Sequence, residues 1–333
     1  MKIDEIIKKC IETPGVSLKQ GNYSTELILK QKEGKGSMTF FPLFSGITLA
    51  YIFVNSPTWP APTLAPIGSN TKGPLIINYC VNGRCELILN NKNYIYVTEQ
   101  QISLTEQFAQ NQYIYPRRIY EGLELFIDLD TTNEHSAYLL ENFDLDLHNL
   151  AAMYCPCGKT YISNATSLMN HTLQNLWALA NETDAYSVLQ MKLLTLSLLG
   201  LLLNKEEIPP SQSCTFYTES QVAIAKKVEK IITSDLRQHY PARELATIFS
   251  ISETSLKNYF RGVFGQNISV YLRELRMQHA AELLISTQSS VSEIAERVGY
   301  INQSKFASVF KKQFGLSPLE YRRLKRLTGI DNF

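Results

Sequence analysis

Two segments near the C-terminal end repeat one pattern of small hydrogen-bonding residues followed by cations, about fifty residues apart. At about 100° per residue, these side chains lie on the helix side opposite Leu256 in the first segment and Phe306 in the second. They are Thr254, Asn258 and Arg261, and then Ser304, Ser308 and Lys311. Hydroxyl and amide groups can hydrogen-bond to base edges, whereas lysine and arginine neutralise phosphates. The pattern indicates two helices that read double-stranded DNA.

Each segment also needs a buried side to hold that polar face in place, and an apolar stripe supplies it. The stripe residues are Leu256, Tyr259, Phe260, Val263 and Phe264, and then Phe306, Val309, Phe310 and Phe314. Their spacing predicts helices over Glu253–Phe264 and Gln303–Phe314. One polar face of this kind is usually only a solvated helix surface. Two faces in the same phase favour DNA binding.

A short helix and a turn precede each of these two helices. The short helices are predicted over Tyr240–Phe249 and Val291–Val298. Ser252 is suited to cap the first of the longer helices. Together the elements form two helix-turn-helix motifs, at about 240–264 and 291–314. A connecting helix over Ser269–Leu284, if rigid, would fix their separation, which should be about 34 Å for adjacent major grooves.

The second motif contains the run SEIAERVGY at Ser292–Tyr300 and the run FKKQFGLSPLEYRR at Phe310–Arg323, with Phe306 between them. These residues resemble the hallmark stretch of the AraC/XylS family of bacterial transcription regulators. The resemblance extends from about Ala223 to Arg323 and implies an all-α domain that binds asymmetric promoter sites. The first turn departs from the family pattern, because Ser250 stands in place of the usual glycine.

The resemblance also implies which side chains of this chain contact DNA. Base contacts are implied for Thr254, Lys257 and Asn258 in the first motif and for Gln303, Ser304, Lys305 and Ser308 in the second. Phosphate contacts are expected from the cations Arg261, Lys311, Lys312, Arg322 and Arg323. A solvated terminus is the alternative interpretation of the basic tail at 321–326.

The segment between Tyr23 and Asp130 consists of short runs rich in Ile, Val, Tyr and Phe, which predict strands. The strands are expected over Glu26–Gln31, Met38–Phe41, Ile47–Val54, Leu75–Val81, Cys85–Leu89, Tyr94–Val97, Gln101–Leu104 and Leu123–Leu129. Asn82-Gly83 is a turn signal, and residues 90–93 are expected to form the turn of a hairpin. This many short strands indicate a β-barrel or sandwich.

Helical periodicity is found before and after these strands. Helices are expected over Lys2–Ile11, Thr131–Asn142, Asn164–Asn181 and Asp184–Leu203. The last is apolar on nearly all sides, so it is either a buried core helix or pairs with a second copy. The predicted fold is therefore two domains: an α+β domain over 1–208, helical from about 131, and an all-α domain over 218–333. Residues 209–217 are the predicted linker.

The order of strands followed by helices resembles the cupin-type sensor domains attached to many AraC/XylS members. Such domains are small β-barrels followed by dimerising helices. The resemblance implies an unknown small-molecule effector, a homodimer and, for an activator, contact with RNA polymerase. Tyr51, Phe53, Tyr79 and Phe126 could line the effector pocket. Ordinary core packing is the alternative, because alternation along a strand cannot say which face is inside.

Charge is distributed unevenly along the chain, although the total is only +1. From Thr218 onward there are 17 basic and 11 acidic residues, a net charge of +6. The remainder has 15 basic and 20 acidic residues, a net charge of −5. A basic end joined to an acidic remainder is typical of a polyanion-binding module attached to another domain.

An enzyme is the main alternative class, since cupin barrels can be metal oxygenases with clustered His and carboxylate ligands. The histidines are His135, His148, His171, His239 and His279, all after the predicted strands. The sequence also lacks a glycine-rich phosphate loop and a nucleophile elbow. We therefore expect no catalytic residue, no metal and no cofactor, with a metal-dependent cupin enzyme as the less favoured alternative. Another alternative is constitutive DNA binding, with an N-terminal domain that only dimerises.

Cys155-Pro156-Cys157 could be a metal or redox pair, but the C-x-C spacing without a second pair favours ordinary loop thiols. No uninterrupted apolar run reaches about 18 residues, and the first residues lack a signal-peptide stretch. We expect a cytoplasmic protein without a membrane span.

Overall fold

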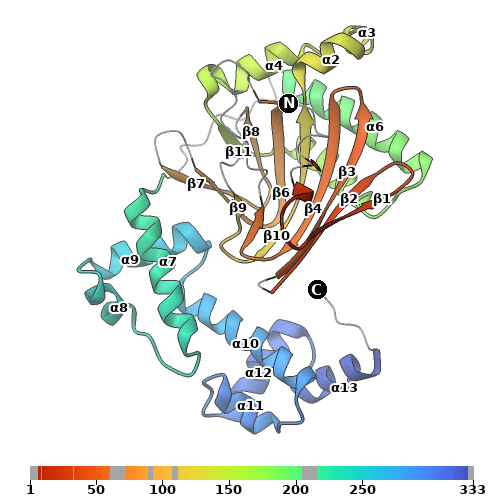
Figure 1. Ribbon diagram of the computed structural model, residues 1–333. Helices are drawn as coiled ribbons and strands as arrows, with labels where there is room; N and C mark the ends of the chain where they lie inside the picture. Colours follow the sequence, from red (N-terminus) through yellow and green to blue (C-terminus); the bar gives the residue numbers. More distant parts are fainter. Residues whose placement is uncertain are drawn as a thin grey trace. The chain divides into compact units, whose positions relative to one another are not determined.

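The computed structural model describes residues 7–8, 10–32, 34–60, 73–88, 93–106, 112–204 and 216–328. The chain divides into two compact units, Met1–Phe216 and Tyr217–Phe333 (Figure 1). The predicted linker at 209–217 lies outside the described residues except for its last two positions.

The N-terminal unit is built on an antiparallel sheet that curls into a half-barrel (Figure 1). Its strands are β1 Val16–Gln20, β2 Thr25–Gln31, β3 Gly34–Phe44, β4 Ile47–Asn55, β5 Thr58–Pro60, β6 Leu75–Ile88, β7 Tyr94–Thr98, β8 Gln101–Thr105, β9 Gln112–Ile114, β10 Ile119–Ile127 and β11 Tyr161–Asn164. In the described residues the main path runs β1-β2-β3-β4-β10-β6-β8-β11. The second half of β6 pairs with β7 and β9, and β9 pairs with β5, so β6 joins both parts of the sheet.

The predicted turn at Asn82-Gly83 is wrong, because β6 continues through it. Gly83 has a φ of +95°, and the pairing of β6 with β10 shifts register between Glu121 and Gly122. A glycine within a strand often marks such a bulge, which bends the strand. A Cβ at position 83 would also overlap the carbonyl group of Ile119. The glycine therefore serves a bend within one strand, not a reversal between two.

The predicted hairpin is confirmed, with Arg84 of β6 opposite Thr98 of β7 and Ile88 opposite Tyr94. Its turn at 90–93 lies outside the described residues apart from the last position. Sequence analysis did not predict β1, β5, β9 or β11. Two of these, β5 and β9, have only three residues each, too few for a periodic signal.

Five described helices follow β10 in the N-terminal unit, with β11 lying between α4 and α5. They are α2 Leu129–His135, α3 Ala137–Asn142, α4 Leu147–Tyr154, α5 Ser167–Ala178 and α6 Ala185–Leu203, and a 3-10 turn, η1 Pro156–Gly158, follows α4. The helix predicted over Thr131–Asn142 is interrupted at Ser136, and α4 was not predicted. The helix predicted over Asn164–Asn181 starts later, because Tyr161–Asn164 pairs with β8. The helix predicted over Lys2–Ile11 lies largely outside the described residues.

The sheet has an apolar cluster on each face. One, here called the helix-side core, includes Leu49 and Tyr51 of β4 together with residues of α4, α5 and α6. The other, here called the inner core, includes Ala50 and Ile52 of β4 and Trp59 of β5, with residues from β2, β3 and β7. Adjacent residues of one strand therefore enter different cores, as the pleat requires.

The described secondary-structure elements of the C-terminal unit from Glu219 onward are all helices (Figure 1). Its helices are α7 Glu219–Ser234, α8 Ala242–Ile248, α9 Glu253–Phe264, α10 Ile268–Ser286, α11 Val291–Arg297, α12 Gln303–Phe314 and α13 Pro318–Thr328. The bounds predicted for α9 and α12 are confirmed residue for residue. The connecting helix α10 is longer than predicted by one residue at its start and two at its end.

Each of the two motifs packs against the helix that follows it through an aromatic cluster, and the two clusters are equivalent. The first comprises Phe260, Phe264 and Tyr271, with ring centroids 4.5, 5.4 and 5.0 Å apart. The second comprises Phe310, Phe314 and Tyr321, with centroids 4.6, 5.4 and 5.2 Å apart. Each member of the second cluster lies fifty positions after its counterpart in the first. The sequence repeat is thus a repeat of packing.

Candidate nucleic-acid interface

The turns that lead into α9 and α12 differ by one residue. In the first, Ile251 N donates to Ala246 O over 3.2 Å, and Ser250 has a φ of +53°. In the second, Tyr300 N donates to Ala295 O over 2.8 Å, and a glycine with a φ of +82° takes the place of the serine. A non-glycine residue in this left-handed region costs roughly 1–2 kcal/mol. The extra residue of the second turn is Ile301, whose side chain is fully exposed.

Both long helices have matching ends. Ser252 Oγ accepts from Ser255 N over 3.0 Å at the start of α9, which confirms the predicted cap. Asn302 Oδ1 accepts from Lys305 N over 2.9 Å at the start of α12. Each helix ends at a left-handed glycine, with φ values of 77° and 76°. The two polar faces are therefore carried on helices of equal length with fixed ends.

The seven side chains predicted to contact bases are all exposed. They are Thr254, Lys257 and Asn258 on α9 and Gln303, Ser304, Lys305 and Ser308 on α12. Lys257 Nζ forms an ion pair with Glu253 Oε1 at 2.5 Å, so it must leave this partner before it can reach a base. The structure thus brings these groups to the outer surface of two helices, and their base contacts stay predictions.

The predicted phosphate-binding cations fall into two groups. Arg261, Lys311, Lys312 and Arg323 are exposed. Arg322 is held inward, because its Nε donates to Leu284 O over 3.1 Å and its Nη2 to Ser289 O over 2.6 Å. These bonds favour a structural role for Arg322, and its phosphate contact stays a prediction.

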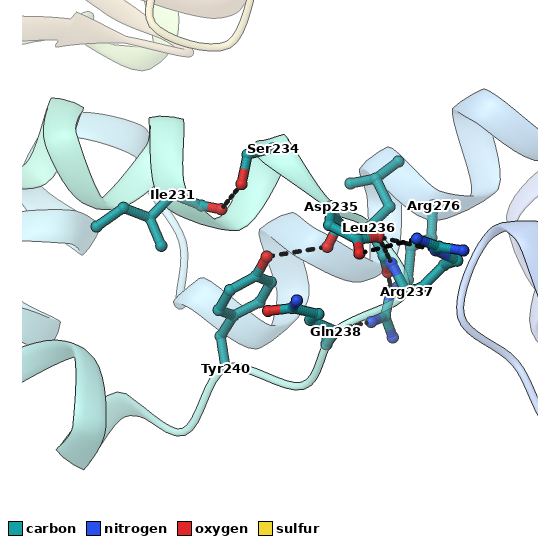
Figure 2. A network of polar contacts seen from close by, with 8 residues as sticks. All are labelled: Ile231, Ser234, Asp235, Leu236, Arg237, Gln238, Tyr240 and Arg276. Atoms are coloured by element: carbon teal, nitrogen blue, oxygen red, sulfur yellow. Dashed lines mark hydrogen bonds and ion pairs between the residues drawn. The ribbon is translucent and has the colours of Figure 1, made fainter.

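Sequence reasoning missed Arg276 of α10, which lies beside the loop before α8 (Figure 2). Its Nε donates to Leu236 O over 2.7 Å and its Nη2 to Gln238 O over 2.8 Å. Arg326, fifty positions later, similarly donates to Thr287 O over 2.6 Å. The repeat spacing of these two arginines was the signal that could have revealed the contact.

A family model described as a helix-turn-helix domain matches residues 245–324, which include most of both motifs. The HTH-type transcriptional activator RhaR of Yersinia pestis bv. Antiqua (strain Angola) is 27% identical over 151 residues, or 45% of this chain and 51% of that protein. RhaR of Enterobacter sp. (strain 638) is 31% identical over 106 residues, or 32% of this chain and 38% of that protein. The C-terminal unit is an AraC-type helix-turn-helix domain.

A solved structure, the C-terminal domain of AraT, a response regulator from Geobacillus stearothermophilus, is also similar to the AraC-type domain. It is 35% identical, covers 30% of this chain and 84% of that chain, and has a TM-score of 0.29. The chain spans about half the length of the curated relatives it matches first.

Outside the AraC-type domain, the structure does not bring the four predicted effector-binding residues to one site. Tyr51, Phe53 and Tyr79 face the helix-side core, where Tyr51 Oη donates to Leu176 O over 2.7 Å and Phe53 lies 4.8 Å from the ring of Trp177. The void beside Tyr79 has a volume of about 10 Å³, room for at most one water molecule. Phe126 lies in the inner core.

The inner core contains a buried carboxyl group that sequence reasoning missed. Glu124 lies in the middle of β10, and within the described residues its Oε2 has no hydrogen-bond partner. Burial raises the pKa of this carboxyl to about 7. Asn78 of β6 lies opposite Glu124 in the strand pairing, and its Oδ1 accepts from Tyr120 Oη over 2.7 Å. Unpaired buried charge is costly, so this carboxyl favours its protonated form.

The structure separates the two thiols of the C-x-C pair. Cys155 is buried and Cys157 is exposed at a φ of +56°. Burial raises the pKa of the Cys155 thiol to about 12, which disfavours the thiolate that metals and redox partners require. Over the described parts of the chain, no group of three or more His, Cys, Asp or Glu side chains could hold a metal ion.

Proposed function

We propose that this chain is a ligand-responsive transcription regulator whose helices α9 and α12 read adjacent major grooves of a promoter. The observation that carries the proposal is the duplicated motif, in which both recognition helices expose hydrogen-bonding and cationic side chains. The nineteen residues of α10 span about 28 Å at 1.5 Å per residue, which is comparable to one turn of B-DNA. The RhaR relatives are named transcriptional activators, which supports regulation of transcription. We propose that the chain acts in the cytoplasm and, as an activator, contacts RNA polymerase.

Specificity would come from the seven base-facing side chains and general affinity from the cations. Selection of bound sequences from random DNA by the full chain tests this division. We expect one asymmetric site with two conserved blocks about one helical turn apart. Recovery of unrelated sequences, or of a single block, would refute the reading by two helices.

We further propose that the chain forms a homodimer through α6. Tyr186, Leu189 and Leu193 follow each other at i, i+3 and i+7 and have exposed fractions of 67%, 50% and 58%. Within α6, all of which is described, Lys192 is the one charged residue, and its Nζ lies 5.6 Å from the centre of the Phe44 ring. The stripe is therefore free of charge, so a two-fold copy can meet it without like-charge repulsion.

The helix α6 is also long and apolar enough to cross a membrane by length and composition, with 39% of its most apolar window buried inside the unit. Sedimentation of the full chain distinguishes a dimer formed through α6 from a monomer. We expect a dimer for the wild type and a monomer for Leu193→Lys. Leu168→Lys, at a similarly exposed position of α5, is the matched control and should stay dimeric. A monomeric wild type in detergent-free buffer contradicts the dimer.

The N-terminal unit is proposed to be a cupin-like sensor domain. The unpartnered Oε2 of Glu124 in the inner core supports a polar ligand on this face of the half-barrel, because an unpaired buried polar atom gains from any hydrogen-bonding group placed beside it. A thermal-shift screen of metabolites against the full chain tests the proposal, since a ligand raises the midpoint by mass action. No hit would favour the constitutive regulator, and stoichiometric metal in the purified protein would favour the enzyme.

A further inference from the structure

The helix α10 belongs to both motifs of the C-terminal unit. Near its start, Tyr271 packs against Phe260 and Phe264 of the first motif. From its middle onward, Met277 and Leu284 share an apolar cluster with the second motif. Since both motifs pack against α10, the orientation of α12 relative to α9 depends on α10 and on any further contact between the two motifs beside it.

A second connection between the two motifs lies beside α10 and involves the loop before α8. Arg276 donates to Leu236 O and Gln238 O in this loop, at 2.7 and 2.8 Å (Figure 2). The same guanidinium lies 6.0 Å from the ring centre of Tyr300, in the turn of the second motif. One side chain thus connects the loop before the first motif to the turn of the second.

The two connected segments also touch each other directly. A Cβ on Gly299 would lie 2.7 Å from Leu236 O and 2.9 Å from Arg237 Cα, so the backbones are already in contact. The loop is braced from within, because Arg237 Nε and Nη2 donate to the carboxylate of Asp235 at 3.1 and 3.2 Å. Tyr240 Oη also donates to Asp235 O over 3.0 Å (Figure 2). A braced loop in backbone contact with a turn resists sliding and rotation.

A comparison with Arg326 shows which contact of Arg276 has no counterpart in the second half of the repeat. It occupies the same repeat position as Arg276 and donates to Thr287 O and Gln288 Oε1, at 2.6 and 3.0 Å, in the loop before α11. Each arginine therefore braces the loop before the first helix of its motif. In the described chain only Arg276 is followed by a further motif. Of the two arginines, Arg276 alone therefore also contacts the turn of a following motif, through the ring of Tyr300.

We infer that Arg276 is a positioning residue that sets the spacing between the two DNA half-sites that the domain accepts. The inference rests on the proposed reading of DNA by α9 and α12. One added base pair moves a half-site by about 3.4 Å and turns it by about 36°. A rigid junction cannot follow that movement, whereas a junction held by α10 alone can bend toward it.

The test uses the full chain, the DNA site selected by the wild type, and versions of that site with one base pair added or removed between its two blocks. A further probe has one block scrambled and reports binding by a single motif. Arg276→Lys keeps the charge but loses the forked bonds to two carbonyl groups. Arg273→Lys, at an exposed position one turn earlier on α10, is the matched control.

We expect the wild type and Arg273→Lys to bind the altered spacings at least about tenfold more weakly than the selected site. For Arg276→Lys this ratio should fall to about threefold or less, with unchanged affinity for the single-block probe. An unchanged ratio overturns the inference, as does an equal loss on all probes, which is the result of a damaged fold. If the wild type selects no site, the proposed function fails as well, so the two failures can be told apart.

Discussion

Replacement of Glu124 by glutamine should stabilise the N-terminal unit at alkaline pH and leave its stability unchanged at acid pH. Glu124 is buried, and burial raises the pKa of its carboxyl from the ordinary 4.5 to about 7. Between these two values the unfolded chain has lost the proton and the folded chain retains it. The contribution of the protonated form is therefore complete below pH 4.5, falls as the pH rises, and is lost above pH 7. At about 1.36 kcal/mol per unit, the loss is on the order of 3 kcal/mol.

Urea unfolding of the full chain, followed by tryptophan fluorescence, measures this effect in one unit. Both tryptophans, Trp59 and Trp177, belong to the N-terminal unit, so the signal excludes the AraC-type domain. Glu124→Gln should unfold at the same urea concentration as the wild type at pH 4.5 and be more stable by up to about 3 kcal/mol at pH 8. Glu121→Gln, at a partly exposed position of the same strand, is the matched control and should follow the wild type. Parallel wild-type and Glu124→Gln curves across this pH range would refute the reasoning.

Three further predictions concern the AraC-type domain. Asn258→Ala should cost roughly 1–3 kcal/mol on the selected DNA site and relax preference at one base pair, which a competition assay with single-base variants would show. Lys311→Ala should weaken all sequences about equally and reduce the salt dependence of binding by about one phosphate; a slope equal to that of the wild type argues against a phosphate contact. Gly299→Ala should destabilise the domain by about 1–3 kcal/mol, because its φ is +82° and the new Cβ would crowd Leu236 O; far-UV circular dichroism during urea unfolding measures this, and Gly315→Ala, with open space around its Cβ, should cost less.

The helices α9 and α12 of the AraC-type domain were predictable because local signals agree there, whereas α13 Pro318–Thr328 was not predicted as a helix. An aromatic stripe, a capping residue and a terminal glycine all specify the same bounds for α9, and the same is true of α12. The whole pattern then occurs twice, which separates it from an accidental solvated face. Arg322 was harder to interpret, because an arginine that binds backbone carbonyls and one that binds phosphate look alike in a sequence.

The N-terminal unit was less predictable because non-local pairing decides its details. Asn82-Gly83 has the composition of a tight turn, and only the pairing of β6 with strands on both of its halves shows that it lies in a bulge. Alternation along β4 correctly implies two faces, but it does not reveal that α5 covers the face of Tyr51 and Phe53. Glu124 looked like an ordinary strand residue, because the sequence does not show which strands pack around it.

The central place of β10 has a consequence for the order in which the two units form. Ile127 of β10 pairs with Ile47 of β4, about eighty residues earlier, so the sheet cannot close until both ends of that long segment meet. The AraC-type domain is helical, and most of its backbone bonds join residues four apart. Sheets with distant pairings fold in about milliseconds to seconds, and helical domains in about microseconds to milliseconds. After dilution from denaturant, the DNA-reading unit should regain its structure well before the unit proposed to sense the ligand.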